Sequence, residues 1–199
     1  GVRPHLKREG GTYFVTFRQA GTLPKEVLLQ FKREYTAAMA QAEAANRPLS
    51  WREREELLRW YSRRVDKYLD AGRGVCHLRD PALAELVAGA IKFYDRERYE
   101  LHAWVVMPNH VHAVVWPKPG QQLSGILQGW KSFTSHLINR RLPAKVVPFW
   151  QNESYDHLIR DEEDLHRCCH YTLMNPVDAR LCTRAGDWRW SSAYSAEAI

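Results

Sequence analysis

The sequence predicts an α+β protein with a ferredoxin-like (split β-α-β) core, in which an antiparallel sheet carries helices on one face. The first observation is the expected order of elements: strand, helices, strand, strand, helix, strand, helix. The second is the length of 199 residues, which suffices for one domain, 1–199, but not for two ordinary ones. The third is a strongly charged stretch, 25–70, which predicts a helical insertion after the first strand.

Turn residues and side-chain types define the first elements. Segment 12–18 (TYFVTFR) is β-branched and aromatic and follows two glycines, which predicts a strand. The stretch 25–45 is charged and alanine-rich and predicts a helix. Ser50 followed by Glu53 is a capping box, which predicts a second helix ending near residue 69.

The remaining elements follow from apolar spacing. Asp80-Pro81 starts a helix, and the apolar runs 99–107 and 110–116 flank a Pro-Asn pair, which indicates a hairpin. Further along, we expect a helix over 123–142, an extended segment over 149–159 and a last helix from Asp161 that Pro176 limits. Trp188 and Trp190 lie two residues apart in an extended tail. We expect them to cover a sheet edge rather than to stack on DNA bases.

The composition narrows the class of protein. The 29 Lys and Arg against 23 Asp and Glu give a net charge of +6, which favours anionic partners such as nucleic acid, although solubility alone also explains it. No apolar run approaches the roughly 20 residues of a membrane-spanning helix, and no apolar leader is visible, so we expect a cytoplasmic protein without a membrane partner. The four cysteines form no CxxC pair and are expected to be free thiols.

The sharpest motif is Val106-Met-Pro-Asn-His-Val-His112. His110 and His112 lie two apart on an expected strand, so their imidazoles point to the same face while Val111 points into the core. Two neighbouring imidazoles can share a metal ion. Paired surface histidines are also common, and the spacing alone leaves both interpretations open.

A second motif lies on the last helix. Tyr171 and Asn175 are four residues apart, hence on one helical face and one turn from each other. With Asp164 they border the expected buried arc, where a side chain rests against the sheet and still reaches a substrate. A tyrosine packed at the core edge and an asparagine near a helix end would give the same spacing.

Together the two motifs describe a plausible catalytic site. Two imidazoles and one amide oxygen give a metal three protein ligands and leave positions open, so that the metal acts as a Lewis acid on a phosphodiester. A tyrosine hydroxyl one turn from Asn175 can attack phosphorus, which yields a phosphotyrosine and a free DNA hydroxyl. The covalent bond conserves the energy for rejoining the strands.

The motifs resemble, in combination and in order, the single-tyrosine HUH transposases of the IS200-like superfamily, and in particular the REP-associated tyrosine transposases. They are 107–112, 130–134 (WKSFT), the FWQ, YD and IRDE segments within 149–162, and 171–177. The resemblance implies an HUH endonuclease core and a metal-dependent single-stranded DNA endonuclease and transesterase. Such an enzyme cleaves and rejoins DNA next to hairpin (REP-like) elements through a covalent 5′-phosphotyrosine.

The resemblance also implies roles for individual residues. His110, His112 and Asn175 match the metal ligands, with Mg²⁺ or Mn²⁺ as the expected ion, and Tyr171 matches the nucleophile. Single-stranded DNA carrying a hairpin is the expected partner, and a monomer is favoured over a dimer. The side chains expected to contact DNA are cationic or hydroxyl-bearing: Arg3, Lys7, Arg8, Lys131, Ser132, Thr134, Arg140 and Arg160. Arg140 ends a helix, so complementing the helix dipole is an equally good reading there.

Other readings compete with these assignments. Tyr155 is the rival nucleophile, but it has no ligand-type residue at helical spacing. His157, His166 and His170 are further candidates to approach the metal, although His166 and His170 are expected to face solvent or DNA.

Two other functions also compete. A catalytically idle hairpin-DNA-binding protein is disfavoured because both histidines, the tyrosine and the asparagine are present. A metal-dependent hydrolase needs a carboxylate base near the histidine pair, and the hairpin offers none closer in sequence than Glu100.

Overall fold

The structure is a computed structural model that describes residues 10–45, 47, 50, 53, 56, 64–72 and 74–195. Its elements are β1 (Tyr13–Arg18), α1 (Lys25–Ala44), η1 (His77–Arg79), α3 (Pro81–Lys92), β2 (Tyr99–Val106), β3 (His110–Pro117), α4 (Leu123–Asn139), β4 (Tyr155–Leu158), α5 (Glu162–Asp178) and η2 (Ala185–Asp187). The four strands form one sheet in the order β2-β3-β1-β4, and every neighbouring pair is antiparallel. This order confirms the α+β, ferredoxin-like prediction.

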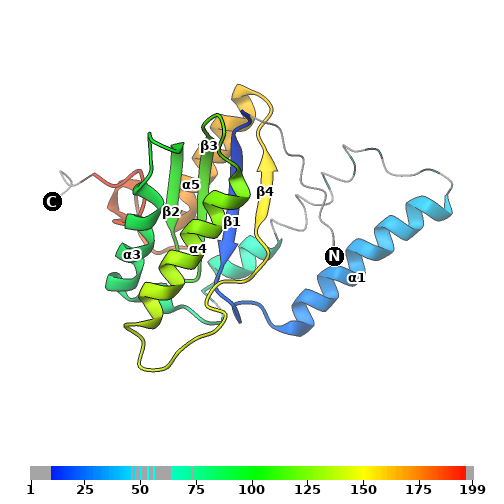
Figure 1. Cartoon of the computed structure of the whole chain (residues 1–199). Helices are drawn as coiled ribbons and strands as arrows, with labels where there is room; N and C mark the ends of the chain where they lie inside the picture. Colours follow the sequence, from blue (N-terminus) through cyan, green and yellow to red (C-terminus); the bar gives the residue numbers. More distant parts are fainter. Residues whose placement is uncertain are drawn as a thin grey trace.

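The two faces of the sheet carry different helices. Alternate residues Val15, Phe17 and Val111 turn to one face, where they join the main hydrophobic core with residues of α3 and α4. Phe14 and Val114 turn to the opposite face and pack with partly buried residues of α5. In Figure 1, α3 and α4 lie in front of the sheet and α5 lies behind it.

The expectation of helices on one face therefore holds for α3 and α4 and needs correcting for α5. Strands β1 and β2 both pair antiparallel with β3, so they are parallel to each other. Strands β3 and β4 both pair antiparallel with β1, so they are also parallel to each other. Parallel strands joined through a helix take a right-handed crossover, which brings both crossover helices to the same face. Helix α5 follows the last strand and is free of that rule, so it covers the face that would otherwise expose Phe14 and Val114.

Hydrogen bonds between buried polar groups of the main core connect the layers. The Tyr99 hydroxyl accepts from Trp130 Nε1 at 2.9 Å and donates to the Ile91 carbonyl at 2.7 Å, so that β2, α3 and α4 share one hydrogen-bonded chain. Trp150 Nε1 donates to Thr134 Oγ1 at 2.8 Å and links the segment before β4 to α4.

The tail covers the β2 edge of the sheet, as favoured from its alternating tryptophans. The Val106 amide donates to the Trp190 carbonyl at 2.8 Å, and Trp188 Nε1 donates to the Val106 carbonyl at 3.0 Å. An edge strand needs such cover because its unpaired backbone groups otherwise invite another strand.

The helical insertion leaves and rejoins the core at one point. A Cβ built on Gly74, whose φ is +81°, would lie 2.6 Å from the Thr22 carbonyl oxygen, so the two ends of the insertion touch. Ser50 and Glu53 make the reciprocal capping bonds of the expected second helix, and residues 64–70 are helical. Arg64 forms an ion pair with Glu34 of α1.

Two expectations from composition can be compared with the structure. All four cysteines are free thiols. Within the described residues, no helix has the length and apolar character needed to cross a membrane.

Candidate metal and nucleophile site

The site is built around the two histidines at the start of β3. His110 and His112 are both fully buried, on the sheet face that α5 covers. Their Nε2 atoms lie 3.0 Å apart, with the rings edge to face. The predicted shared face is therefore confirmed, and the two nitrogens converge on one point.

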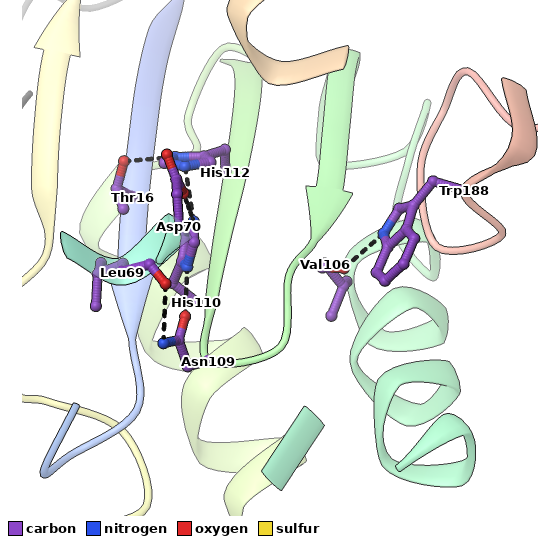
Figure 2. A network of polar contacts seen from close by, with 8 residues as sticks. All are labelled: Thr16, Leu69, Asp70, Val106, Asn109, His110, His112 and Trp188. Atoms are coloured by element: carbon purple, nitrogen blue, oxygen red, sulfur yellow. Dashed lines mark hydrogen bonds and ion pairs between the residues drawn. The ribbon is translucent and has the colours of Figure 1, made fainter. Parts of the chain in front are cut away.

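Hydrogen bonds on the far side of each ring orient the pair (Figure 2). His112 Nδ1 lies 2.8 Å from Thr16 Oγ1 on β1, and His110 Nδ1 lies 2.7 Å from Asn109 Oδ1. The amide nitrogen of Asn109 donates to the Leu69 carbonyl at 3.2 Å, which leaves only its oxygen to face His110. Because that oxygen can only accept, we assign the proton of His110 to Nδ1 and a lone pair to Nε2.

The charge state of the pair suits metal binding. Burial, followed by the neighbouring His110, holds the pKa of His112 well below its usual value. Its imidazole is therefore neutral at physiological pH, which is the form that ligates a metal ion.

Tyr171 on α5 packs directly against the histidine pair. Its ring centroid lies 5.3 Å from that of His112 and 5.8 Å from that of Phe14. Burial, and then the negative charges of Asp66 and Asp70, raise the pKa of the Tyr171 hydroxyl above its ordinary value. The hydroxyl is thus protonated at neutral pH and needs an acceptor for its proton before it can act as a nucleophile.

Two carboxylates that sequence reasoning missed complete the surroundings of the site. Asp70 Oδ1 lies 3.4 Å from His110 Nε2, and the Asp66 carboxyl lies within hydrogen-bonding reach of the Tyr171 hydroxyl. Both come from the helical segment 64–70 of the insertion. The usable signal was their spacing of four residues, the same as that of Tyr171 and Asn175, which puts them on one helical face.

Asn175 is buried without a partner. Its side chain has no solvent exposure, and neither its amide oxygen nor its amide nitrogen has a hydrogen-bond partner among the described residues. Leaving such a group unpaired costs about 1–3 kcal/mol, and an unsatisfied buried polar group calls for an explanation such as a bound ion. The position is compatible with the predicted ligand role.

The donors present fit a divalent metal ion. One ligand atom each from Asp70, His110 and His112 lies within 4.8 Å of the others. Imidazole nitrogens with a carboxylate oxygen suit Mn²⁺ and similar divalent ions. The Asn175 amide, buried without a partner among the described residues, lies on α5, the helix whose Tyr171 contacts His112. The structure therefore agrees with the expectation of a divalent cation without selecting one.

The predicted DNA contacts divide by location. Lys131 and Ser132 line a groove between α4 and the segment 147–154, on the sheet face opposite the histidines. Lys131 Nζ already donates to the carbonyls of Gln151 and Asn152 at 3.0 and 3.1 Å, and burial followed by the charge of Arg18 lowers its pKa to about 8.

The remaining predicted contacts differ in accessibility. Ser132, Arg140 and Arg160 are exposed. Thr134 is buried and bonded to Trp150, so its hydroxyl is not accessible to DNA, and this part of the prediction is corrected. The N-terminal candidates lie outside the described residues: Arg3, Lys7 and Arg8.

The alternative residues lie close to the site but in other roles. Tyr155 on β4 packs edge to face on Phe14 at 6.3 Å, whereas Tyr171 contacts His112 itself. His157 Nε2 lies 2.7 Å from Asp164 Oδ2 and ties β4 to α5. His166 and His170 are exposed, as expected.

The buried carboxyl of Asp66 makes stability depend on pH in the metal-free protein. Burial, and then Asp70, raise the pKa of Asp66 from 3.8 to about 8. The folded protein therefore keeps a proton that the unfolded chain has released, and this contribution is lost as the pH rises to about 8. Between pH 7.0 and 8.5, we expect the free energy of unfolding to fall about 1 kcal/mol more in the parent than in Asp66→Asn.

Thermal melts of both proteins in EDTA at the two pH values measure this difference. Parallel pH profiles for the parent and Asp66→Asn would contradict the assignment of a raised pKa to Asp66.

Comparison with known proteins places similarities on the segment that carries this site. Residues 78–171, which include both histidines and Tyr171, match the family model described as Transposase IS200 like. The chain is 27% identical over 109 residues to a REP-associated tyrosine transposase of Escherichia coli (strain K12), across 54% of this chain and 63% of that relative. The resemblance indicated by the motifs is thereby confirmed.

A solved structure supports the fold assignment. The chain resembles the structure of a REP-associated tyrosine transposase bound to a REP hairpin with a TM-score of 0.56 and 19% identity, covering 96% of this chain and 81% of the other. The insertion residues Asp66 and Asp70 precede the family match at 78–171, so their role has to be argued from this structure alone.

Proposed function

We propose that the protein is a metal-dependent, single-stranded DNA endonuclease and transesterase that cleaves and rejoins DNA next to hairpin elements through a covalent 5′-phosphotyrosine. The observation that carries the proposal is the contact of the Tyr171 ring with His112, 5.3 Å between centroids, beside the buried pair of His110 and His112. The transposase relatives, one of them solved with a hairpin, support the choice of substrate.

In this proposal His110, His112 and Asn175 hold a divalent ion, Mg²⁺ or Mn²⁺. When bound, the ion supplies Lewis-acid stabilisation of the charge that develops on the scissile phosphate. The hydrogen bonds from Thr16 and Asn109 keep both imidazoles oriented toward the shared point.

Tyr171 performs the covalent step. Its hydroxyl oxygen forms a bond to phosphorus while the bond from phosphorus to the 3′ oxygen breaks, which leaves a 5′-phosphotyrosine and a 3′ hydroxyl. The proton that Tyr171 gives up is matched by the proton that the departing 3′ oxygen takes up, so the step is balanced; Asp66, within hydrogen-bonding reach of the hydroxyl, can relay this proton once its own carboxyl is deprotonated. Rejoining is the same exchange in reverse, with a 3′ hydroxyl attacking the phosphotyrosine.

We propose that the DNA contacts are divided between the two faces of the sheet. Arg160 is exposed between β4 and α5, on the approach to the Tyr171 helix. Lys131, Ser132 and Arg140 belong to the far side of the sheet, where they would hold flanking DNA rather than the scissile phosphate. We further propose that the N-terminal arm supplies a second group of DNA contacts through Arg3, Lys7 and Arg8. We also propose that the active species is a monomer.

We expect cleavage of unpaired DNA joined to a hairpin and little cleavage of a blunt duplex of the same length. The attack has to be in line with the scissile bond, and Tyr171 is held on a helix against His112, so the phosphate must move to the tyrosine. A flexible strand can do this, whereas pairing holds the phosphate in the duplex. The preference should persist at raised salt, where sequence-independent phosphate attraction weakens.

A competition between the two substrates at two salt concentrations, with Mn²⁺ present, tests this preference. Equal cleavage of hairpin-plus-tail and duplex would contradict the single-strand assignment.

The structure also supplies the carboxylates that the hydrolase alternative requires and that the sequence did not place near the histidines. Asp66 and Asp70 bring carboxylates to the histidine pair, although the hairpin itself has none nearer than Glu100. A hydrolase activates water and releases product, whereas the proposed enzyme retains DNA on Tyr171. Denaturing electrophoresis of the protein after incubation with a 3′-labelled oligonucleotide separates the two, because only the transesterase retains the 3′ part of the strand as a covalent adduct.

A further inference from the structure

Three atoms that can ligate a metal ion meet beside β3. His110 Nδ1 carries a proton beside Asn109, so in the neutral ring Nε2 carries a lone pair. It faces His112 Nε2 at 3.0 Å and Asp70 Oδ1 at 3.4 Å. Among the described residues, that Asp70 oxygen is buried and has no hydrogen-bond partner. The Asp70 oxygen and the lone pair of a neutral His110 are two acceptors, which repel each other unless a proton or a cation lies between them.

The local chain structure holds Asp70 at this point. The amide of Gly72 donates to the Leu69 carbonyl at 2.9 Å, and Gly72 has a φ of +63°, the conformation with which glycine commonly ends a helix. The Leu69 carbonyl also accepts from Asn109, whose oxygen orients His110. One asparagine thus joins the helix end to the imidazole, as the dashed contacts in Figure 2 show.

This placement is unfavourable without a positive charge. A carboxylate in the last turn of a helix opposes its dipole. Here Asp70 is the last helical residue of the segment 64–70. A divalent cation between Asp70 and the imidazoles would offset the repulsion, the dipole and the missing hydrogen bond together.

We propose that Asp70 is a ligand of the metal ion, so that the charged insertion supplies part of the metal site. The inference rests on the proposed function for the presence of the ion and extends it to a residue outside the family match. Imidazoles that ligate a metal ion are neutral, and the Asn175 amide carries no charge, so Asp70 would contribute the single negative charge of the ligand set. The expected ion is therefore a divalent cation that binds both oxygen ligands and imidazole, such as Mn²⁺.

Calorimetric titration of the full, metal-free chain with Mn²⁺ tests this assignment without any DNA. We expect one site in the parent and at least about tenfold weaker binding in Asp70→Asn, because a charged ligand is replaced by a neutral one of the same shape. Glu97→Gln is the matched control: it removes one negative charge from an exposed side chain and should bind Mn²⁺ like the parent. Parent-like binding by Asp70→Asn, or no binding by the parent, would overturn the assignment.

Hydrogen exchange gives a second readout that needs no variant. If Asp70 ligates the ion, Mn²⁺ should slow the exchange of backbone amides in 64–72 of the parent. Unchanged exchange in that segment at saturating Mn²⁺ would contradict the inference even if Asp70→Asn does not fold. A parent that binds Mn²⁺ through Asp70 but forms no DNA adduct would leave this inference standing and reject the proposed function, so the two can fail separately.

Discussion

Replacing Tyr171 with phenylalanine is expected to abolish the covalent DNA adduct while the protein still folds and binds hairpin DNA. The substitution removes the hydroxyl oxygen that would bond to phosphorus and keeps the ring that packs on His112 and Phe14. Mass mapping after incubation with single-stranded hairpin DNA and Mn²⁺ should find modified Tyr171 in the parent and no adduct in the variant. DNA affinity should change little, because phosphate contacts and stacking supply most of it.

The effect on stability follows from the neighbour of the hydroxyl. Asp66 is buried and loses the hydroxyl as a partner in Tyr171→Phe, so we expect a loss of about 1–3 kcal/mol in the free energy of unfolding. Tyr155→Phe is the matched control, since Tyr155 packs on the same Phe14 from β4 and should keep adduct formation. Adduct formation by Tyr171→Phe together with its loss in Tyr155→Phe would transfer the nucleophile to Tyr155.

Changing His110 or His112 to alanine is expected to lower cleavage by at least about a thousandfold and to leave DNA affinity largely intact. Metal-ion stabilisation of developing charge is worth several kcal/mol, and each 1.4 kcal/mol is a factor of ten in rate. The variants lose a buried imidazole whose Nε2 points to the shared site. Cleavage rates and hairpin binding, measured on the same preparations, separate the two effects.

A histidine outside the site controls for the loss of an imidazole in general. His102 is exposed on β2, and His102→Ala should cleave DNA at the parental rate. Titration with Mn²⁺ should show a site in the parent and none in the double variant at positions 110 and 112. Equal Mn²⁺ binding by the parent and the double variant would reject both histidines as ligands.

The sequence by itself determined the elements that local patterns encode. The split β-α-β order followed from apolar runs and turn residues, because period-two and period-3.6 spacing report directly on strands and helices. The same periodicity placed His110 and His112 on one face of a strand and Tyr171 with Asn175 on one face of a helix. These relations span at most a few residues along the chain, and the structure confirms the shared face of the histidines.

Only the tertiary structure decided which faces meet. Nothing local in α5 states that it covers the sheet face opposite α3 and α4, and that placement is what brings Tyr171 onto His112. Asp70 lies 40 positions before His110 in the chain and yet 3.4 Å from it, held through the hydrogen bond between Asn109 and the Leu69 carbonyl. Contacts between segments so far apart depend on how whole helices pack, which short-range spacing does not record, and for this reason the sequence did not place the carboxylates of the insertion at the site.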